Sequence, residues 1–168
     1  MTYVEFGRKE QALEVYKSLQ GIDEARAKTL YDEINTSYAK PDNDIGNLDL
    51  GISFLRRGQD FYVDALRPLR RAVLLKPDPD TSGQAHYLIG EILKDQNKPT
   101  QATGEFEQAV AALQQAIRLN PRDADSYYWL GTVDVELGRK ADALRVYKTL
   151  QSINPAKAKE LYEEINKK

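Results

Sequence analysis

Cysteine is absent from this 168-residue chain, and histidine and tryptophan occur only once each. Without cysteine the chain has no disulfide, no thiol nucleophile and none of the common cysteine-ligated zinc sites. With one histidine and no cysteine, the sequence shows no nucleophile–base pair for covalent catalysis and no ordinary transition-metal site. The sequence therefore predicts a protein that is not an enzyme and that has no catalytic residues, no metal and no cofactor.

Long apolar runs and an excess of one sign of charge are also missing. No stretch approaches the roughly 20 apolar residues that a membrane-spanning helix needs. The chain has 24 Lys and Arg residues against 26 Asp and Glu residues, so no overall field favours nucleic acid or a membrane surface. We expect no nucleic-acid binding and no membrane insertion. The sequence predicts a soluble protein and leaves open whether it is cytoplasmic or periplasmic.

What the sequence does contain is internal repetition. Residues 7–35 are identical to residues 138–166 at 19 of 29 positions. A finer repeat runs through NLDLGISF (47–54), HYLIGEIL (86–93) and YYWLGTVD (127–134), each with an aliphatic residue before a glycine. A polar turn, an alanine-spaced amphipathic segment and a proline follow each of them. Such periods are typical of helical arrays, in which each unit buries its apolar flank only against its neighbours.

These residues resemble the tetratricopeptide repeat, a helix–turn–helix unit of 34 residues. The segment 124–157 matches the family pattern at Leu130, Gly131, Gly138, Ala143, Tyr147 and Pro155. The resemblance, which is to the bacterial type, implies an all-α fold in which helical hairpins stack into a right-handed solenoid. It implies three full repeats (44–77, 81–121 and 124–157) and a C-terminal cap helix (158–168).

The N-terminal segment matches the end of such an array rather than its beginning. Residues 1–40 read as a truncated second helix followed by a cap-like helix, which together form an N-terminal half-repeat. We expect the chain to be a segment of a longer protein in which a unit of about 131 residues recurs. The apolar side of helix 8–20 would then lack a first helix, and its exposure would favour self-association through Leu13, Tyr16 and Leu19.

The residue types inside the repeats predict how the helices pack. Gly51, Gly90 and Gly131 should lie where the two helices of one hairpin cross, because a side chain there would hold the backbones apart. Pro77, Pro121 and Pro155 should end the second helices, since the residue before a proline avoids the α region. The segment DPDTSG (78–83) is interpreted as a loop between hairpins, and Pro68 as a kink or late start of its helix.

The resemblance also implies a binding surface, because the first helices of such hairpins line a concave groove. Exposed aromatic residues beside aliphatic ones are what a peptide-binding or helix-binding site uses as anchors. Tyr127 can serve as the packing aromatic, which leaves Trp129 facing the groove unless a neighbouring hairpin covers it. The implied groove residues are Leu48, Asp49, Ile52, Arg56, Tyr87, Leu88, Glu91, Tyr128, Trp129 and Thr132.

Two classes of function are compatible with these features. The first is a non-catalytic interaction scaffold that holds a peptide or helical segment of another protein in the groove. The lysine, asparagine and arginine set of chaperone-tail-binding relatives is missing, so capture of a C-terminal carboxylate is disfavoured. The alternative is a structural module that serves self-association, as a homodimer, or packs against neighbouring domains.

Three features have both an ordinary and a functional interpretation. His86 stands at a packing position and is interpreted as a core or half-buried histidine rather than a ligand. Asp134 replaces an expected aromatic and is interpreted as a solvated or hydrogen-bonded carboxylate, with a titrating switch as the alternative. The third feature is an arginine group, read as a solvated face rather than a nucleic-acid site: Arg56, Arg57, Arg67, Arg70 and Arg71.

Overall fold

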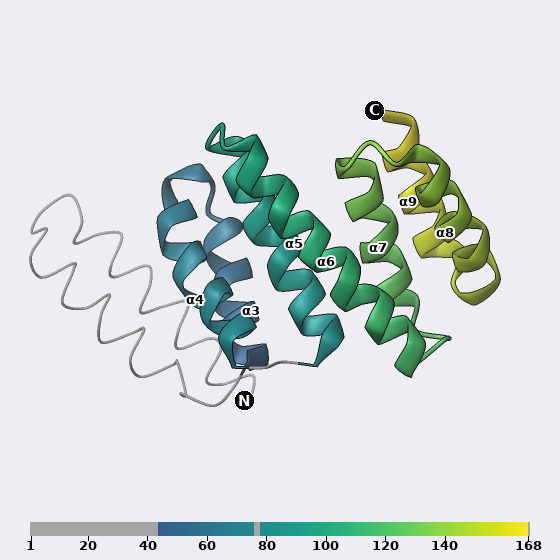
Figure 1. The fold of residues 1–168 in the computed structure, drawn as a ribbon, viewed down its shortest axis with the longest axis horizontal. Helices are drawn as coiled ribbons and strands as arrows, with labels where there is room; N and C mark the ends of the chain where they lie inside the picture. Colours follow the sequence, from purple (N-terminus) through teal and green to yellow (C-terminus); the bar gives the residue numbers. More distant parts are fainter. Residues whose placement is uncertain (1–43, 76–77, 168) are drawn as a thin grey trace, which may run out of the picture.

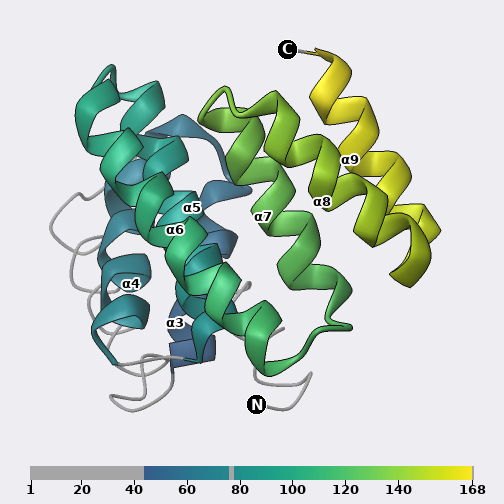
Figure 2. The ribbon, with the colours of Figure 1, turned by 45° about the vertical axis from the view of Figure 1, so that its right-hand side comes forward.

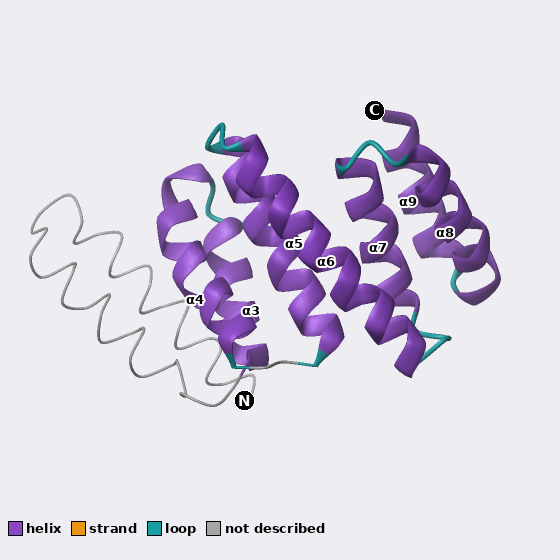
Figure 3. Cartoon of the chain, in the orientation of Figure 1, coloured by secondary structure: helices purple, strands orange, loops and turns teal. Residues whose placement is uncertain are grey.

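The computed structural model describes residues 44–75 and 78–167 (Figure 1). Within these residues the chain is helical and contains no strand (Figure 3), so the predicted all-α fold is confirmed. The sequence-based predictions for residues 1–40, including the half-repeat and the surface around Leu13, Tyr16 and Leu19, lie outside the described residues. The elements are α3 (Asp44–Leu55), η1 (Gln59–Phe61), α4 (Tyr62–Leu74), α5 (Pro79–Asp95), α6 (Pro99–Leu119), α7 (Ala124–Glu136), α8 (Lys140–Ile153) and α9 (Pro155–Lys167).

The helices stack in two layers, as a solenoid of hairpins (Figures 1 and 2). α3 pairs with α4, α5 with α6, and α7 with α8, while α9 packs against both α7 and α8. The first helices also touch in succession, since α3 contacts α5, α5 contacts α7, and α7 contacts α9. These four helices form the inner layer, and α4, α6 and α8 form the outer layer.

Glycine permits the close approach of helices in the first two hairpins. A Cβ atom on Gly51 would lie 2.4 Å from Leu69 Cδ2, and one on Gly90 would lie 2.5 Å from Phe106 Cε1. Both partners belong to the second helix of the same hairpin, as the sequence predicted. At Gly131 the nearest atoms belong to Leu161 of α9, 2.4 Å away. The expectation that Gly131 meets the second helix of its own hairpin is therefore corrected, because α9 occupies the space that this glycine leaves.

The start of α5 also differs from the sequence-based interpretation. Asp78 caps the helix, since its carboxylate accepts hydrogen bonds from the amides of Asp80 (3.0 Å) and Thr81 (3.1 Å). Pro79 occupies the first helical position, where its missing N–H is not needed. Residues 79–83 are thus the first turns of α5, and the prediction of a loop over 78–83 is wrong.

The same capping arrangement opens α9. The Asn154 side chain accepts a hydrogen bond from the amide of Lys157 at 3.1 Å, and Pro155 is the first residue of the helix. Pro155 therefore ends α8 and begins α9, which starts three residues earlier than the predicted cap at 158. In the first hairpin, α4 runs from Tyr62 through Pro68 to Leu74, with the Pro68 ring buried.

Candidate functional site

Three aromatic side chains meet where α5 and α7 lie side by side. The ring of Trp129 lies 5.3 Å from that of Tyr87 and 5.5 Å from that of Tyr128, measured between centroids. All three residues are half-buried. We call Tyr87, Tyr128 and Trp129 the aromatic cluster. Trp129 is therefore partly covered by the neighbouring hairpin and partly open. The sequence had left open whether it faces the groove or is covered, and the structure shows a position between the two.

α9 supplies a carboxylate that fixes one side of the aromatic cluster. The Tyr128 hydroxyl donates to Glu164 Oε1 at 2.7 Å, and the Thr132 hydroxyl donates to Glu164 Oε2 at 2.9 Å. Burial and the hydrogen bond to Glu164 raise the pKa of Tyr128, so its hydroxyl stays a donor. The Lys157 ammonium lies 5.7 Å from the centroid of the Tyr128 ring. The orientation of Tyr128 is thus set from α9.

A lysine joins α5 to α7 on the other side of the cluster. Lys94 Nζ lies 2.5 Å from Glu91 Oε1 and 2.5 Å from Glu136 Oε2. Burial alone would lower the pKa of Lys94, but the hydrogen bonds to Glu136 and Glu91 outweigh it and raise the pKa. Burial, followed by the charges of Glu91 and Glu136, raises the pKa of Tyr87. The aromatic cluster therefore lies between the Lys94–Glu136 ion pair on one side and the Glu164 carboxylate on the other.

A small hollow opens beside the aromatic cluster. Its volume is about 200 Å³, and it is lined by Tyr87, Thr132, Val135, Glu136, Glu164 and Lys167. The lining joins apolar surface to two carboxylates and one ammonium group. Such a mixture suits a ligand side chain that has both an apolar body and a polar end.

The structure divides the predicted groove residues into accessible and inaccessible ones. Leu48 is 6% exposed and Thr132 is 5% exposed, so neither offers contact area to a partner, and their assignment to an open groove is corrected. Leu48 belongs to the core, and the Thr132 hydroxyl is used by Glu164. The other eight remain accessible, Asp49 and Arg56 as exposed residues and the rest as half-buried ones: Ile52, Tyr87, Leu88, Glu91, Tyr128 and Trp129.

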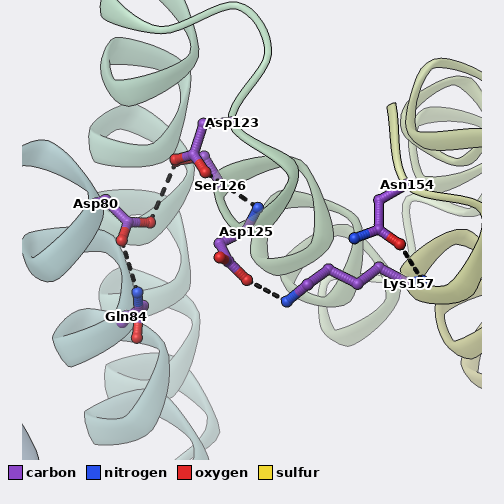
Figure 4. A network of polar contacts seen from close by, with 7 residues as sticks. All are labelled: Asp80, Gln84, Asp123, Asp125, Ser126, Asn154 and Lys157. Atoms are coloured by element: carbon purple, nitrogen blue, oxygen red, sulfur yellow. Dashed lines mark hydrogen bonds and ion pairs between the residues drawn. The ribbon is translucent and has the colours of Figure 1, made fainter. Parts of the chain in front are cut away.

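Polar contacts at the helix starts fix the spacing of the inner helices (Figure 4). Asp80, at the second position of α5, accepts a hydrogen bond from the Ser126 hydroxyl at the third position of α7 (3.2 Å). Asp125, at the second position of α7, forms an ion pair with Lys157 at the third position of α9. In both links, a carboxylate at the second position of one inner helix contacts a donor group at the third position of the next inner helix. These links hold α5, α7 and α9 in register, and with them the aromatic cluster.

Burial, followed by the nearby Asp123, raises the pKa of Asp80, because its ionised form is costly beside another carboxylate. The hydrogen bonds from Ser126 and Gln84 oppose this shift. Within residues 44–75 and 78–167, no group of three or more His, Asp or Glu side chains is arranged to hold a metal ion. The contacts of the carboxylates at these helix starts are those of caps and of links between helices.

Two polar residues singled out in the sequence are not part of the aromatic cluster. His86 Nδ1 lies 2.7 Å from Glu105 Oε2, so the half-buried histidine links α5 to α6. Asp134 is 5% exposed, which corrects the expectation of a solvated carboxylate. Burial, followed by the nearby Asp142, raises the pKa of Asp134 to about 6, against the opposing charges of Arg139 and Arg145.

Sequence comparison with family models identifies the repeats. Residues 102–138 match the model described as TPR repeat, and residues 124–157 match the model described as Tetratricopeptide repeat. Residues 102–157 of the chain therefore consist of tetratricopeptide repeats. Such repeats build protein-interaction scaffolds that are generally not catalytic, with extended surfaces on the inner side of the solenoid. In the described part of the chain, no helix has the length and apolar character needed to span a membrane.

A comparison with curated proteins finds no match to this chain. Among solved structures, a crystal structure of the MamA protein is 26% identical and covers 93% of this chain and 81% of its own, with a TM-score of 0.49. A second MamA structure is 27% identical, with coverages of 86% and 92% and a TM-score of 0.48. YrrB, titled a TPR protein with an unusual peptide-binding site, is 17% identical, with coverages of 92% and 82% and a TM-score of 0.47.

Proposed function

We propose that this tetratricopeptide-repeat protein binds a peptide or helical segment of a partner protein on its inner face, the side formed by α3, α5, α7 and α9. The observation that carries the proposal is the aromatic cluster. A half-buried tryptophan between two tyrosines, with aliphatic neighbours, has the composition of a binding hot spot. Trp129 is the main anchor for the partner.

The surroundings of the aromatic cluster favour binding because they are already ordered. Tyr128 is held by Glu164, and α5 is joined to α7 by the ion pair between Lys94 and Glu136. Side chains that are fixed before binding lose little conformational entropy when a partner arrives. A partner would therefore gain most of the contact energy that these rings can offer.

The hollow beside the aromatic cluster indicates the chemistry of the partner side chain that enters it. Its apolar wall is formed by Tyr87 and Val135, and its polar groups are Glu136, Glu164 and Lys167. We propose that one apolar or aromatic residue of the partner covers Trp129. A neighbouring residue with an apolar stem and a hydrogen-bonding end would then fill the hollow.

The test uses a phage-displayed library of random peptides, panned on the whole chain. For a selected peptide, Trp129→Ala should weaken binding by about 2 kcal/mol or more, which is roughly 30-fold in Kd. Tyr162→Ala is the matched control, because Tyr162 is an exposed aromatic residue on α9 that lies outside the aromatic cluster. Equal affinities for the wild type and Trp129→Ala, or loss of binding only in Tyr162→Ala, would contradict the proposal.

Self-association is the second candidate, and exposed aromatic surface at α9 favours it. The ring of Tyr162 lies 5.0 Å from that of Tyr147, beside a hollow of about 190 Å³ lined also by Gln151 and Lys159. A second copy of the chain that packs there would cover both rings. Light scattering over a range of concentrations tests this: a homodimer that Tyr162→Ser dissociates would support it, and a strict monomer would exclude it.

A further inference from the structure

The outward side of α4 carries a row of apolar and arginine side chains. Six residues line one hollow of about 520 Å³: Val63, Leu66, Arg67, Arg70, Arg71 and Leu74. Their spacing of three and four residues places them on one side of the helix. We call this row the α4 face. The opposite side of α4 is fixed in the core by Ala65, Leu69 and Ala72, which are fully buried.

The apolar ends of the α4 face are unusually open to solvent. Val63 is 74% exposed and Leu74 is 79% exposed, whereas Leu66 between them is half-buried. At 1.5 Å per residue, Val63 and Leu74 lie about 16 Å apart along the helix. Two apolar contacts at that distance match one side of a partner helix of about three turns.

The arginines between these ends are exposed, and their side chains make no hydrogen bond or ion pair with any residue that the structure describes. Elsewhere in the described array, Lys94, Arg139 and Lys157 each pair with a carboxylate of another helix. Arg67, Arg70 and Arg71 thus place three positive charges in one groove of a protein whose pI is about 5.6. A guanidinium group offers a planar pair of donors that suits a carboxylate.

We propose that the α4 face is a second docking surface, which binds an acidic amphipathic helix of a partner protein. Carboxylates spaced three or four residues apart on that helix pair with Arg67, Arg70 and Arg71. Its aliphatic residues contact Val63 at one end and Leu74 at the other. Because α4 belongs to the outer layer, this surface is separate from the inner face around Trp129 and does not depend on the function proposed above.

The mixed character of the face favours a helix over other acidic partners. Nucleic-acid phosphates would pair with the arginines but would leave Val63 and Leu74 in water. A lipid surface needs a continuous apolar side, and here arginines separate the two exposed apolar residues. Only a ligand that has both carboxylates and aliphatic groups uses the whole face.

The probe is a fluorescent helical peptide of about four turns, with two leucines spaced as Val63 and Leu74 are and glutamates between them. Its binding to the whole chain is measured by fluorescence anisotropy. Arg70→Glu with Arg71→Glu should weaken binding by at least about tenfold, and added salt should weaken it further. Val63→Ser with Leu74→Ser should weaken it severalfold. Arg118→Glu makes the same change of charge per residue at an exposed site on α6. This control should leave the affinity for the peptide unchanged.

Three outcomes would overturn the proposal, with circular dichroism confirming that each variant keeps its helix content. The first is equal binding of a peptide in which glutamine replaces every glutamate. The second is an equal loss of affinity in Arg118→Glu. The third is that the glutamate peptide fails to bind while duplex DNA, or vesicles of phosphatidylserine and phosphatidylcholine, bind in a way that requires Arg70 and Arg71.

Discussion

The first and last hairpins both contain a glycine packed against a leucine, but the leucine belongs to a different helix in each case. A Cβ atom on Gly51 would lie 2.4 Å from Leu69, and Leu69 belongs to α4, the hairpin partner of α3. A Cβ atom on Gly131 would lie equally close, at 2.4 Å, to Leu161, which belongs to α9. The aliphatic–glycine motif thus specifies a close approach but not which helix makes it. In the last hairpin the leucine comes from α9, so α9 is part of the core. In the first hairpin the leucine comes from the second helix of the same hairpin.

Truncation of the leucine in each glycine–leucine contact is expected to have the largest effect on stability. Leu69 and Leu161 are both fully buried, so Leu69→Ala and Leu161→Ala should each lower the free energy of unfolding by about 2–5 kcal/mol. Urea denaturation followed by circular dichroism measures both variants. A cost of less than about 1 kcal/mol for Leu161→Ala, together with about 2–5 kcal/mol for Leu69→Ala, would show that α9 is not part of the core.

Replacing the glycine of such a contact by alanine should have the next largest effect on stability. Gly131→Ala should cost about 1–3 kcal/mol, because the new methyl group overlaps Leu161 of α9. Gly104→Ala is the control, since nothing lies within 4 Å of a Cβ at this position of α6. It should stabilise the chain by about 0.5–1 kcal/mol through helix propensity alone. Thermal unfolding of both variants against the wild type measures the difference, and a neutral Gly131→Ala would argue against the tight contact.

The two hairpins also differ three residues after the glycine. α3 has Phe54 there, fully buried, whereas α7 has the buried carboxylate of Asp134, whose pKa burial raises from 3.8 to about 6. A raised pKa means that the folded chain favours the protonated acid. Its contribution to stability is therefore complete below about pH 4 and is lost as the pH rises to about 6.

Asp134→Asn mimics the protonated acid and should stabilise the chain by about 1–2 kcal/mol near neutral pH. The gain should shrink as the pH falls toward 4, because the wild-type carboxyl is then neutral as well. Melting temperatures of the variant and the wild type across this pH range measure the effect. A gain that does not change with pH would show that the Asp134 carboxylate is not the titrating group.

The smallest expected effect concerns the hydrogen bonds that α9 makes with α7. Glu164→Gln keeps the shape of the side chain but removes the charge that Tyr128 and Thr132 bind, so it should cost about 1 kcal/mol. Glu163→Gln, the exposed neighbour on the same helix, should cost close to nothing. Denaturation midpoints of the two variants provide the comparison, and equal values would show that the Glu164 contacts contribute nothing to stability.

The sequence predicted the hairpins because their packing depends on small residues at fixed spacing, and Gly51 and Gly90 lie as expected. It misplaced the start of α5, because Asp78 and Pro79 fit both a loop and a capped helix start. It placed Leu48 and Thr132 in the groove by repeat position alone, whereas their burial depends on neighbouring helices. It also missed Glu164, although Leu161 and Ile165 at neighbouring positions place this residue near the inner face.

Binding of a partner to the inner face around Trp129 can be measured directly, because the chain has a single tryptophan. A ¹H–¹⁵N NMR spectrum has one indole signal, and its assignment is confirmed by its absence in Trp129→Phe. Titration with a peptide selected from the phage-displayed library should shift or broaden that signal, along with backbone signals of α5, α7 and α9. An indole signal that stays in place at saturation, while signals from α4 or α8 move, would contradict binding at the inner face.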